Sequence, residues 1–395
     1  MSLVHHLIPL LRSGSSSAAV HLLHLIVALL IYIFACRLVV KQLNGHWREI
    51  LFAAFNIAGV YLFLFYKRQE HYQLMFLIYL GLVAFQFVML RAFAQKKGRV
   101  PWLAFFTPIA ALIVVRYSPL AGLPRIPGLA WTASGLGLVG ISYLAFRTSR
   151  LVLEVRNGSV PRPTFCEYLN FSFFLPTMPV GPINSYANYR HGFAEPQWNV
   201  PMGRAALRIL VGLVKYQFLG GLANQLTFSN LLLDDHPHPW TDLPIAMVFY
   251  YLFLYCNFSG FCDMAIGAAG LIGIPVPENF DNPFASRNVK EFWNRWHITL
   301  SQWMRDVVFA PLSKYLVRVM GPPNADHAIA LGVVANHYYT IVLKKRLGRD
   351  RFKAYNENRW IKGFAVVMTF MYCAASFFLF ANTFPDMKEI VSILR

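Results

Sequence analysis

The sequence predicts an all-α membrane protein of about ten to twelve membrane segments, some of them broken or re-entrant around a central cavity. Hydrophobic residues make up 56% of the 395 residues and charged residues only 14%, a balance at which a soluble fold would aggregate. The aromatic residues lie in long apolar runs, which excludes a disordered chain. Several runs are too short or too rich in Gly and Pro to span a bilayer alone, so they need a protein-lined or water-filled interior.

The candidate segments follow one another along the chain with short polar breaks. They are residues 18–36, 50–66, 72–90, 102–115, 126–146, 165–183, 205–223, 243–258, 263–274, 298–317, 327–343 and 363–381. Within the sixth of these, FLPTMPVGP at 174–182 contains three prolines and one glycine. Because proline removes a backbone donor and blocks the preceding turn, this part is predicted to be broken helix.

The net charge of +18 comes from Lys and Arg residues in short segments between apolar runs, as cytoplasmic loops require. The densest basic segment is 344–359, whereas 234–242 contains Asp and His but neither Lys nor Arg. We therefore place the first in the cytoplasm and the second outside. No basic face suited to a nucleic-acid groove can be drawn, so we expect membrane lipid, and not nucleic acid, around this protein.

The cysteines do not indicate a metal site or a disulfide framework. There are five of them, and none forms a CxxC motif. They lie in or beside apolar runs, which favours a role as small core residues. We expect no metal and no bound cofactor.

Polar residues concentrate in one segment, 277–312. If it is helical from Val289 onward, a single polar stripe forms from Lys290, Asn294, His297, Ser301 and Arg305. Glu291 and Arg295, four residues apart, are predicted to form an ion pair. One interpretation is an interfacial amphipathic helix with its Trp residues at headgroup level. The other is an active site, in which a neutral His297 imidazole takes a proton from a hydroxyl group and returns it to a leaving group.

A second polar feature is Asp263, a carboxylate inside the apolar segment 257–278. Such a residue is either functional or a polar anchor for a neighbouring helix. Gly260, Gly267, Gly270 and Gly273 surround it and are predicted to permit close helix contact. They do not form a nucleotide-binding loop, because no strand precedes them and no Lys-Ser/Thr pair follows.

Five motifs together resemble the membrane-bound O-acyltransferase family, in the bacterial branch that acts on alginate and teichoic acids. They are GISYLAF at 140–146, FLPTMPVGPI at 174–183, FSGFCDMAIG at 258–267, PENFDNPF at 277–284 and EFWNRWHITLSQWMRDVVFAPL at 291–312. The resemblance divides the chain into N-terminal transmembrane helices, 1–139, and an acyltransferase-like catalytic core, 140–395. The Glu-Phe-Trp-x-x-Trp-His motif with its downstream Arg-Asp is the most specific part.

The resemblance implies a multi-helix membrane fold with funnels from both faces that meet at a buried histidine. His297 matches the first of the family's two signature histidines, so it is the predicted catalytic residue. The predicted substrate or tunnel residues are Asn294, Arg295, Trp296, Ser301, Arg305, Asp306, Asp263 and Glu291. An acyl thioester, acetyl-CoA or an acyl-carrier protein, would be the cytoplasmic co-substrate. A thioester is already activated, so the enzyme need only orient it, deprotonate the hydroxyl and stabilise the oxyanion.

The sequence departs from the family at its second histidine, which normally stands in a Trp-His-Gly context on an apolar helix. His337, in VVANHYYT, is a weak substitute. The chain resembles the start of that helix before Leu331 and its continuation after Gly332, as if a stretch were missing at the join. Two explanations stay open. Either a segment is missing from this sequence at the join, or the chain is a real short variant in which His337 replaces the family residue or the chain is inactive.

The sequence thus predicts an acyltransferase of a bacterial inner membrane. The transferred acyl group is predicted to be acetyl, and its acceptor a hydroxyl of an extracytoplasmic glycan or of a relay partner. Two alternatives stay open. One is an inactive scaffold for a periplasmic or other extracytoplasmic acyltransferase. The other is a lipid or substrate transporter in which Asp263, and not His297, is the sensitive position.

Overall fold

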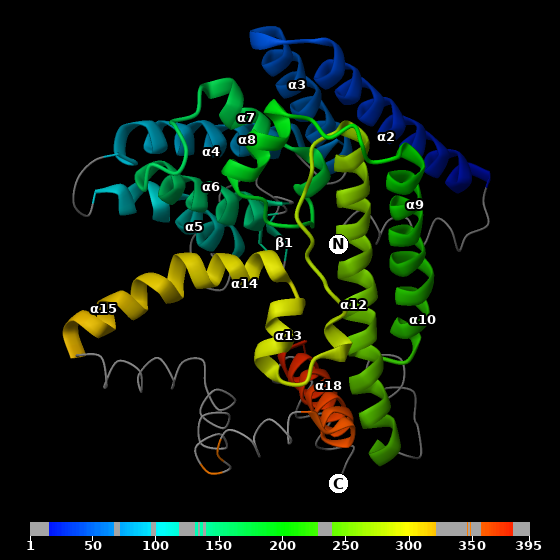
Figure 1. The fold of residues 1–395 in the computed structure, drawn as a ribbon. Coiled ribbons are helices and arrows are strands. Elements are labelled where there is room, and N and C mark those ends of the chain that lie inside the picture. Colours follow the sequence, from blue (N-terminus) through cyan, green and yellow to red (C-terminus); the bar gives the residue numbers. More distant parts are fainter. Residues whose placement is uncertain are drawn as a thin grey trace. The chain divides into compact units, whose positions relative to one another are not determined.

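The structure, a computed structural model, describes residues 16–66, 72–95, 100–117, 131–132, 135–136, 140–227, 239–320, 346, 348 and 357–381 (Figure 1). His337, the join at 331–332 and the predicted segment 327–343 lie outside the described residues, so the predictions made for them stay predictions. The described chain is helical apart from turns, loops and one hairpin of two-residue strands.

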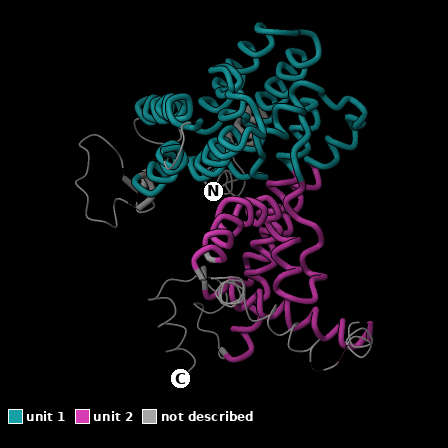
Figure 2. The backbone as a smooth tube through the Cα atoms, turned by 60° about the vertical axis from the view of Figure 1, so that its left-hand side comes forward, with its two compact units in different colours: residues 1–209, 264–277 teal, residues 210–263, 278–395 magenta. Residues whose placement is uncertain are grey.

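The chain forms two compact units (Figure 2). Unit 1 consists of residues 1–209 and 264–277, and unit 2 of residues 210–263 and 278–395. These bounds follow spatial contacts and differ from the division at residue 139, which rests on sequence resemblance and stays a prediction. The predicted active-site segment, 277–312, lies in unit 2 except for its first residue, Pro277.

Unit 1 is built mainly from helices that precede residue 210. Its elements are α2 (Ser16–Gln42), α3 (Gly45–Val60) with η1 (Tyr61–Phe65), α4 (Tyr72–Phe93), α5 (Pro101–Tyr117), β1 (Trp131–Thr132), β2 (Gly135–Leu136), α6 (Ile141–Arg156), α7 (Phe165–Ser172), η2 (Leu175–Thr177), α8 (Tyr186–Ala194) and the first part of α9 (Met202–Leu213). Helix α7 begins with a capping box, in which Thr164 and Glu167 exchange side-chain and backbone hydrogen bonds.

Unit 2 contains the helices on either side of the polar segment. Its elements are the end of α9, η3 (Val214–Leu219), α10 (Gly220–Gln225), most of α12 (Pro239–Ile272), η4 (Pro283–Ala285), α13 (Val289–Arg295), α14 (Ile298–Met304), η5 (Arg305–Phe309), α15 (Ala310–Met320) and α18 (Arg359–Ala381). Elements η3 and η5 are π-helical turns inserted in longer helices, and η1 is a π-helical turn at the end of α3.

Among the described residues, five helical segments are long and apolar enough to cross a membrane. They are Gly45–Phe65, Tyr72–Phe93, Met202–Gln225, Trp240–Ile272 and Arg359–Leu379. Large apolar side chains such as Leu77, Phe218 and Phe364 are exposed on them, as expected for helices that face lipid. The protein is therefore a multi-pass membrane protein, whereas the predicted count of ten to twelve segments is not confirmed.

Three of the predicted segments change in the structure. Residues 243–258 and most of 263–274 belong to one continuous helix, α12, because the glycine between them, Gly260, leaves a membrane helix intact. Segment 126–146 is not one helix, since α6 begins only at Ile141 and runs to Arg156. Segment 165–183 is broken as predicted: α7 ends at Ser172, and the proline-rich part contains only the short η2 turn.

Helix α12 uses two faces for two kinds of packing. Gly260 and Gly267 lie on one face, where an added Cβ would come within 2.6 Å of the Gly212 carbonyl oxygen and within 2.8 Å of the Ala205 carbonyl oxygen. The predicted close helix contact is therefore confirmed at these two glycines. Tyr251, Tyr255 and Phe258, at helical spacing on the other face, contact the aromatic residues of the predicted active-site segment.

Candidate active site

The predicted continuous helix through His297 does not form. Helix α13 ends at Arg295, Trp296 is extended, and His297 adopts a left-handed backbone (φ 44°, ψ 52°) before α14 begins at Ile298. The predicted polar stripe is therefore wrong, because the break rotates the residues after 297 relative to those before it. The π-turn η5 changes the register again at Arg305.

The break is held by a short antiparallel pairing with residues 279–281. Phe280 and Trp296 form an isolated β-bridge, the Asp281 N–H donates to the Arg295 carbonyl at 2.9 Å, and the Ile298 N–H donates to the Asn279 carbonyl at 2.9 Å. A left-handed backbone at a residue with a Cβ costs roughly 1–2 kcal/mol. These hydrogen bonds over-determine that conformation and fix the position of the imidazole.

The side chain of Asn279 connects His297 to α14 and α12. This residue is fully buried. Its Oδ1 accepts from the Thr299 backbone N–H at 3.2 Å and from the Thr299 hydroxyl at 2.9 Å, and it lies 3.1 Å from His297 Nδ1. Its Nδ2 donates to Cys262 Sγ at 3.2 Å. A single amide therefore joins three segments that are far apart in the sequence.

This arrangement determines which ring nitrogen of His297 carries a proton. The Thr299 backbone N–H can only donate, so the Asn279 atom that faces it must be the oxygen. His297 Nδ1 faces the same oxygen, so a hydrogen bond between them requires a proton on Nδ1. In the neutral imidazole, Nε2 is then left with a free lone pair. That tautomer can accept a proton from a hydroxyl group.

The surroundings keep the imidazole neutral. The Phe258 ring packs edge-on against it at 4.7 Å between centroids. His297 lies outside the five helical segments that could cross a membrane. Burial of its imidazole lowers the pKa well below the ordinary value. Trp296, 3% exposed, belongs to an adjoining aromatic cluster with Tyr251, Phe292 and Phe377. The site therefore offers a neutral base against an apolar wall.

Glu291 and Arg295 form the predicted ion pair at 2.8 Å. Glu291 also accepts from the Arg287 backbone N–H at 3.0 Å, and its own N–H donates to the Asn288 side chain at 2.8 Å. These are the contacts of a helix N-terminus. They give both residues a structural part at the start of α13, and their predicted part in substrate binding stays a prediction.

The other predicted substrate residues lie at different distances from the network. Ser301 is one turn into α14, with its hydroxyl 3.5 Å from the Trp296 carbonyl. Asn294, Arg305 and Asp306 are exposed, and the last two form an ion pair at 3.3 Å. The structure brings Trp296 and Ser301 next to His297 and leaves the three exposed residues on the surface of unit 2.

Asp263 pairs with Lys215 of η3 at 2.7 Å between Oδ2 and Nζ. Both residues belong to unit 2. Asp263 follows Cys262 directly, but it lies on the side of α12 that packs against η3, and Cys262 contacts Asn279. Of the two interpretations of Asp263, the ion pair favours a polar anchor between neighbouring helices.

Sequence reasoning missed Asn279, Thr299, Cys262 and Phe258. Asn279 lies in the PENFDNPF motif and Thr299 in the histidine motif, so the resemblance marked both segments without assigning either side chain a part. Cys262 was predicted to be a small core residue, and it is buried. Within the described residues, no group of three or more His, Cys, Asp or Glu side chains could hold a metal ion.

The geometry defines a helical membrane protein with a neutral, hydrogen-bonded histidine at a helix break. Residues 138–320 match the model of the MBOAT, or membrane-bound O-acyltransferase, family. The resemblance seen in the motifs is thus confirmed over this part of the chain, and the match supports an O-acyltransferase.

Similar proteins include two teichoic acid D-alanyltransferases. That of Streptococcus thermophilus is 29% identical and aligns with 85% of this chain and 94% of its own length. That of Bacillus subtilis is 29% identical over 62% of this chain and 69% of its own length. A protein of Pseudomonas aeruginosa described as "Probable alginate O-acetylase" is 30% identical over 44% of this chain and 34% of its own length.

Proposed function

We propose that this protein transfers an acyl group from a thioester donor on the cytoplasmic side of a bacterial inner membrane to a hydroxyl group of a cell-envelope polymer. The observation that carries this proposal is the hydrogen bond between Asn279 and His297, which leaves a lone pair on Nε2 of a neutral imidazole. A base of this kind is what hydroxyl acylation requires.

The reaction needs one proton transfer in each direction. His297 Nε2 removes the proton of the acceptor hydroxyl while its oxygen attacks the thioester carbonyl, so a C–O bond forms and a tetrahedral oxyanion develops. The C–S bond then breaks, and the thiol leaves with the proton returned by the imidazolium. Asn279 keeps Nδ1 protonated throughout, so only Nε2 exchanges the proton.

The proposed identity of the acyl group rests on how much of each similar protein aligns with this chain. The D-alanyltransferase of Streptococcus thermophilus aligns with nearly its whole length, whereas the match to the alginate protein covers about a third of that protein. This difference favours D-alanine as the acyl group and a teichoic-acid-like polymer as the acceptor. Acetyl transfer to a glycan is the second candidate, supported by the shorter match.

The donor is proposed to be acetyl-CoA or an acyl-carrier protein, with no bound cofactor. The basic segments predicted for the cytoplasmic side would suit either acidic partner. An extracytoplasmic acyltransferase is a further proposed partner, which would relay the acyl group to the final polymer.

The test uses the purified full chain in vesicles, with labelled D-alanyl-carrier protein or acetyl-CoA on one side and the polymer on the other. We expect covalent labelling of the polymer and a loss of roughly 10²-fold or more in His297→Ala, the contribution typical of a general base. His191→Ala is the matched control, because that imidazole is 66% exposed on α8 and should leave transfer unchanged.

Each other outcome contradicts a part of the proposal. Equal labelling by His297→Ala and the native protein would exclude His297 as the base. Movement of label across the vesicle without a covalent product would indicate a transporter. If envelope acylation in cells needs this chain but the purified chain transfers nothing, the scaffold hypothesis is favoured.

A further inference from the structure

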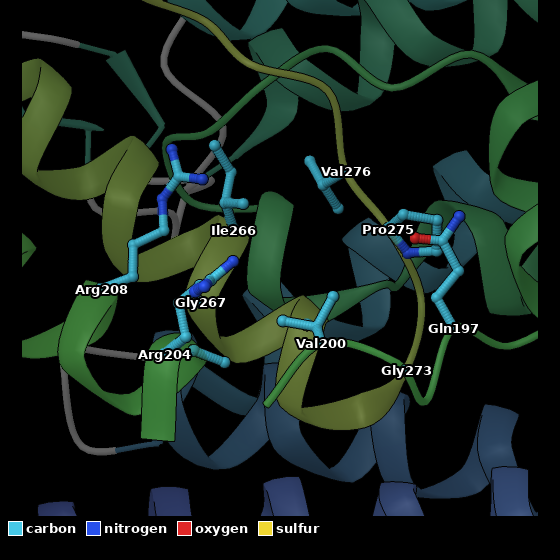
Figure 3. A pocket seen from close by; sticks show the side chains of 11 residues that line it. Gln197, Val200, Arg204, Arg208, Ile266, Gly267, Gly273, Pro275 and Val276 are labelled. Carbon is cyan, nitrogen blue, oxygen red and sulfur yellow. The ribbon is translucent and has the colours of Figure 1, made fainter. Parts of the chain in front are cut away.

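A pocket of about 170 Å³ lies in unit 1, apart from the His297 network (Figure 3). It is formed where the N-terminus of α9 meets the C-terminal end of α12 and the segment that follows α12. Its walls are Gln197, Val200, Arg204, Ala205, Arg208, Ile266, Gly267, Gly270, Gly273, Pro275 and Val276. The proposed acyl transfer uses none of these residues.

The charge of the pocket favours an anion. Arg204 and Arg208 lie on one wall and Gln197 on the opposite wall, as Figure 3 shows, and no Asp or Glu is among the lining residues. The wall that carries the two arginines is formed by the first two turns of α9, at the end where the helix dipole is positive. Two guanidinium groups and a helix N-terminus on one wall are suited to phosphate oxygens.

The walls are held in place by close packing. An added Cβ at Gly267 would lie 2.6 Å from an Ile209 side-chain atom and 2.8 Å from the Ala205 carbonyl oxygen. Gly273 has a φ of +97°, and an added Cβ there would collide with the Trp198 ring at 2.6 Å. The Arg37 guanidinium stacks over that ring at 4.8 Å and donates to the Leu271 carbonyl at 2.6 Å. The pocket is therefore preformed.

The position of the pocket indicates the membrane interface. Helix α12 has 34 residues, about 51 Å at 1.5 Å per residue, which exceeds the roughly 30 Å of the hydrocarbon core. A helix of this length extends beyond the hydrocarbon core at one end or both, and the two arginines beside its C-terminal end are expected at headgroup level. Since α12 begins after the acidic segment predicted to lie outside, this end is on the predicted cytoplasmic side, where anionic headgroups attract Arg side chains.

We propose that this pocket binds the phosphate group of an anionic phospholipid. Arg204 and Arg208 contact the phosphate oxygens, and Val200, Ile266 and Val276 contact the glycerol and the first methylenes of the acyl chains. The phosphates of coenzyme A or of a carrier protein share this chemistry. The apolar walls and the interfacial position favour the lipid.

The test is native mass spectrometry of the detergent-solubilised full chain mixed with equal amounts of phosphatidylglycerol and diacylglycerol with the same acyl chains. We expect retention of phosphatidylglycerol by the native protein and a loss of about tenfold or more in Arg204→Gln/Arg208→Gln, equivalent to about 1.4 kcal/mol. Arg162→Gln, an exposed arginine in another basic loop, is the control and should retain the lipid.

A second variant fills the volume of the pocket and leaves both arginines in place. An added Cβ at Gly270 meets only Ala205 Cβ, at 3.7 Å, within the 4 Å considered, so Gly270→Leu should fold while its side chain fills the pocket and displaces the lipid. Equal retention of phosphatidylglycerol by the native protein and the double arginine variant would overturn the proposal. Arginine-dependent binding of coenzyme A with no lipid retained would also overturn it.

Discussion

Helix α12 contacts polar groups on two different sides, and the two sets are in different chemical states. On one side, Cys262 contacts the Asn279 amide that holds His297, and every member of this network is neutral or kept neutral by burial. On the other side, Asp263 forms an ion pair with Lys215. The comparison teaches that polar groups in an apolar protein serve two purposes: the neutral network orients a reactive atom, and the ion pair joins two helices.

The largest expected effect lies in the neutral network. Asn279→Leu removes the acceptor for His297 Nδ1, so the imidazole is free to adopt the other tautomer, and we expect kcat to fall about 100-fold. It also leaves the Thr299 N–H without this acceptor, at a cost of about 1–3 kcal/mol in the free energy of unfolding. Acyl transfer per folded molecule, measured beside thermal unfolding, separates the two effects.

Asn279→Asp is the matched variant, because it keeps an acceptor oxygen at the same place. A carboxylate beside the imidazole favours its charged form, so the acid limb of the pH profile of kcat/KM should move to higher pH. A purely structural part for Asn279 predicts no such movement. An Asn279→Leu protein with native kcat would break the comparison.

The ion pair should affect stability. Lys215 and Asp263 are 28% and 15% exposed, so removal of one partner leaves a largely buried charge. We expect Lys215→Met or Asp263→Asn to lower the free energy of unfolding by about 1–3 kcal/mol, and the double variant to recover most of that loss. Chemical denaturation of the four proteins gives the coupling energy. Additive losses would show that the charges act independently.

An effect of similar size is expected at the close helix contact. Gly260→Val places side-chain atoms against the Gly212 carbonyl and Tyr216, so we expect a loss of about 1–3 kcal/mol. Gly221→Ala is the control: Gly221 is also helical, an added Cβ meets nothing within 4 Å, and the stability should rise by about 0.5–1 kcal/mol. Melting temperatures in detergent check both, and equal shifts in the same direction would contradict the close packing.

The smallest effect is the pH dependence of stability that His297 contributes. Because its pKa is lowered in the folded protein, the unfolded chain binds a proton below about pH 6.5 that the folded chain does not. This contribution is full above that pH and is lost as the pH falls, by at most about 1.4 kcal/mol per pH unit. Melting curves between pH 7.5 and 5 should be flatter for His297→Gln than for the native protein, and parallel curves would exclude a buried neutral imidazole.

The sequence predicted those features that depend on residues close together in the chain. The Glu291–Arg295 pair follows from a spacing of four residues, and the broken helix at 174–182 follows from its prolines. The break at His297 could not be predicted in this way, because it depends on hydrogen bonds to Asn279, 18 residues earlier in the sequence. Periodicity indicated one continuous helix there, and nothing in residues 289–305 alone contradicts it.

The same reasoning explains why α12 was predicted as two segments and is one helix in the structure. The apolar run was predicted as two segments, 243–258 and 263–274, but a neighbouring helix supplies Lys215 as a partner for Asp263 and a backbone against which Gly260 packs. Such compensation depends on residues about 50 positions away and is visible only in three dimensions. Hydropathy located the helix and left its continuity open.

The central claim is that Asn279 holds His297 in the neutral tautomer with the proton on Nδ1. Nitrogen-15 NMR of the full chain with labelled imidazoles measures this directly, with the His297→Gln protein used to assign one signal among the 12 histidines. At pH 7 we predict a protonated Nδ1 and an unprotonated Nε2, and a change of this pattern in Asn279→Leu. A proton on Nε2, or on both nitrogens, in the native protein would contradict the account.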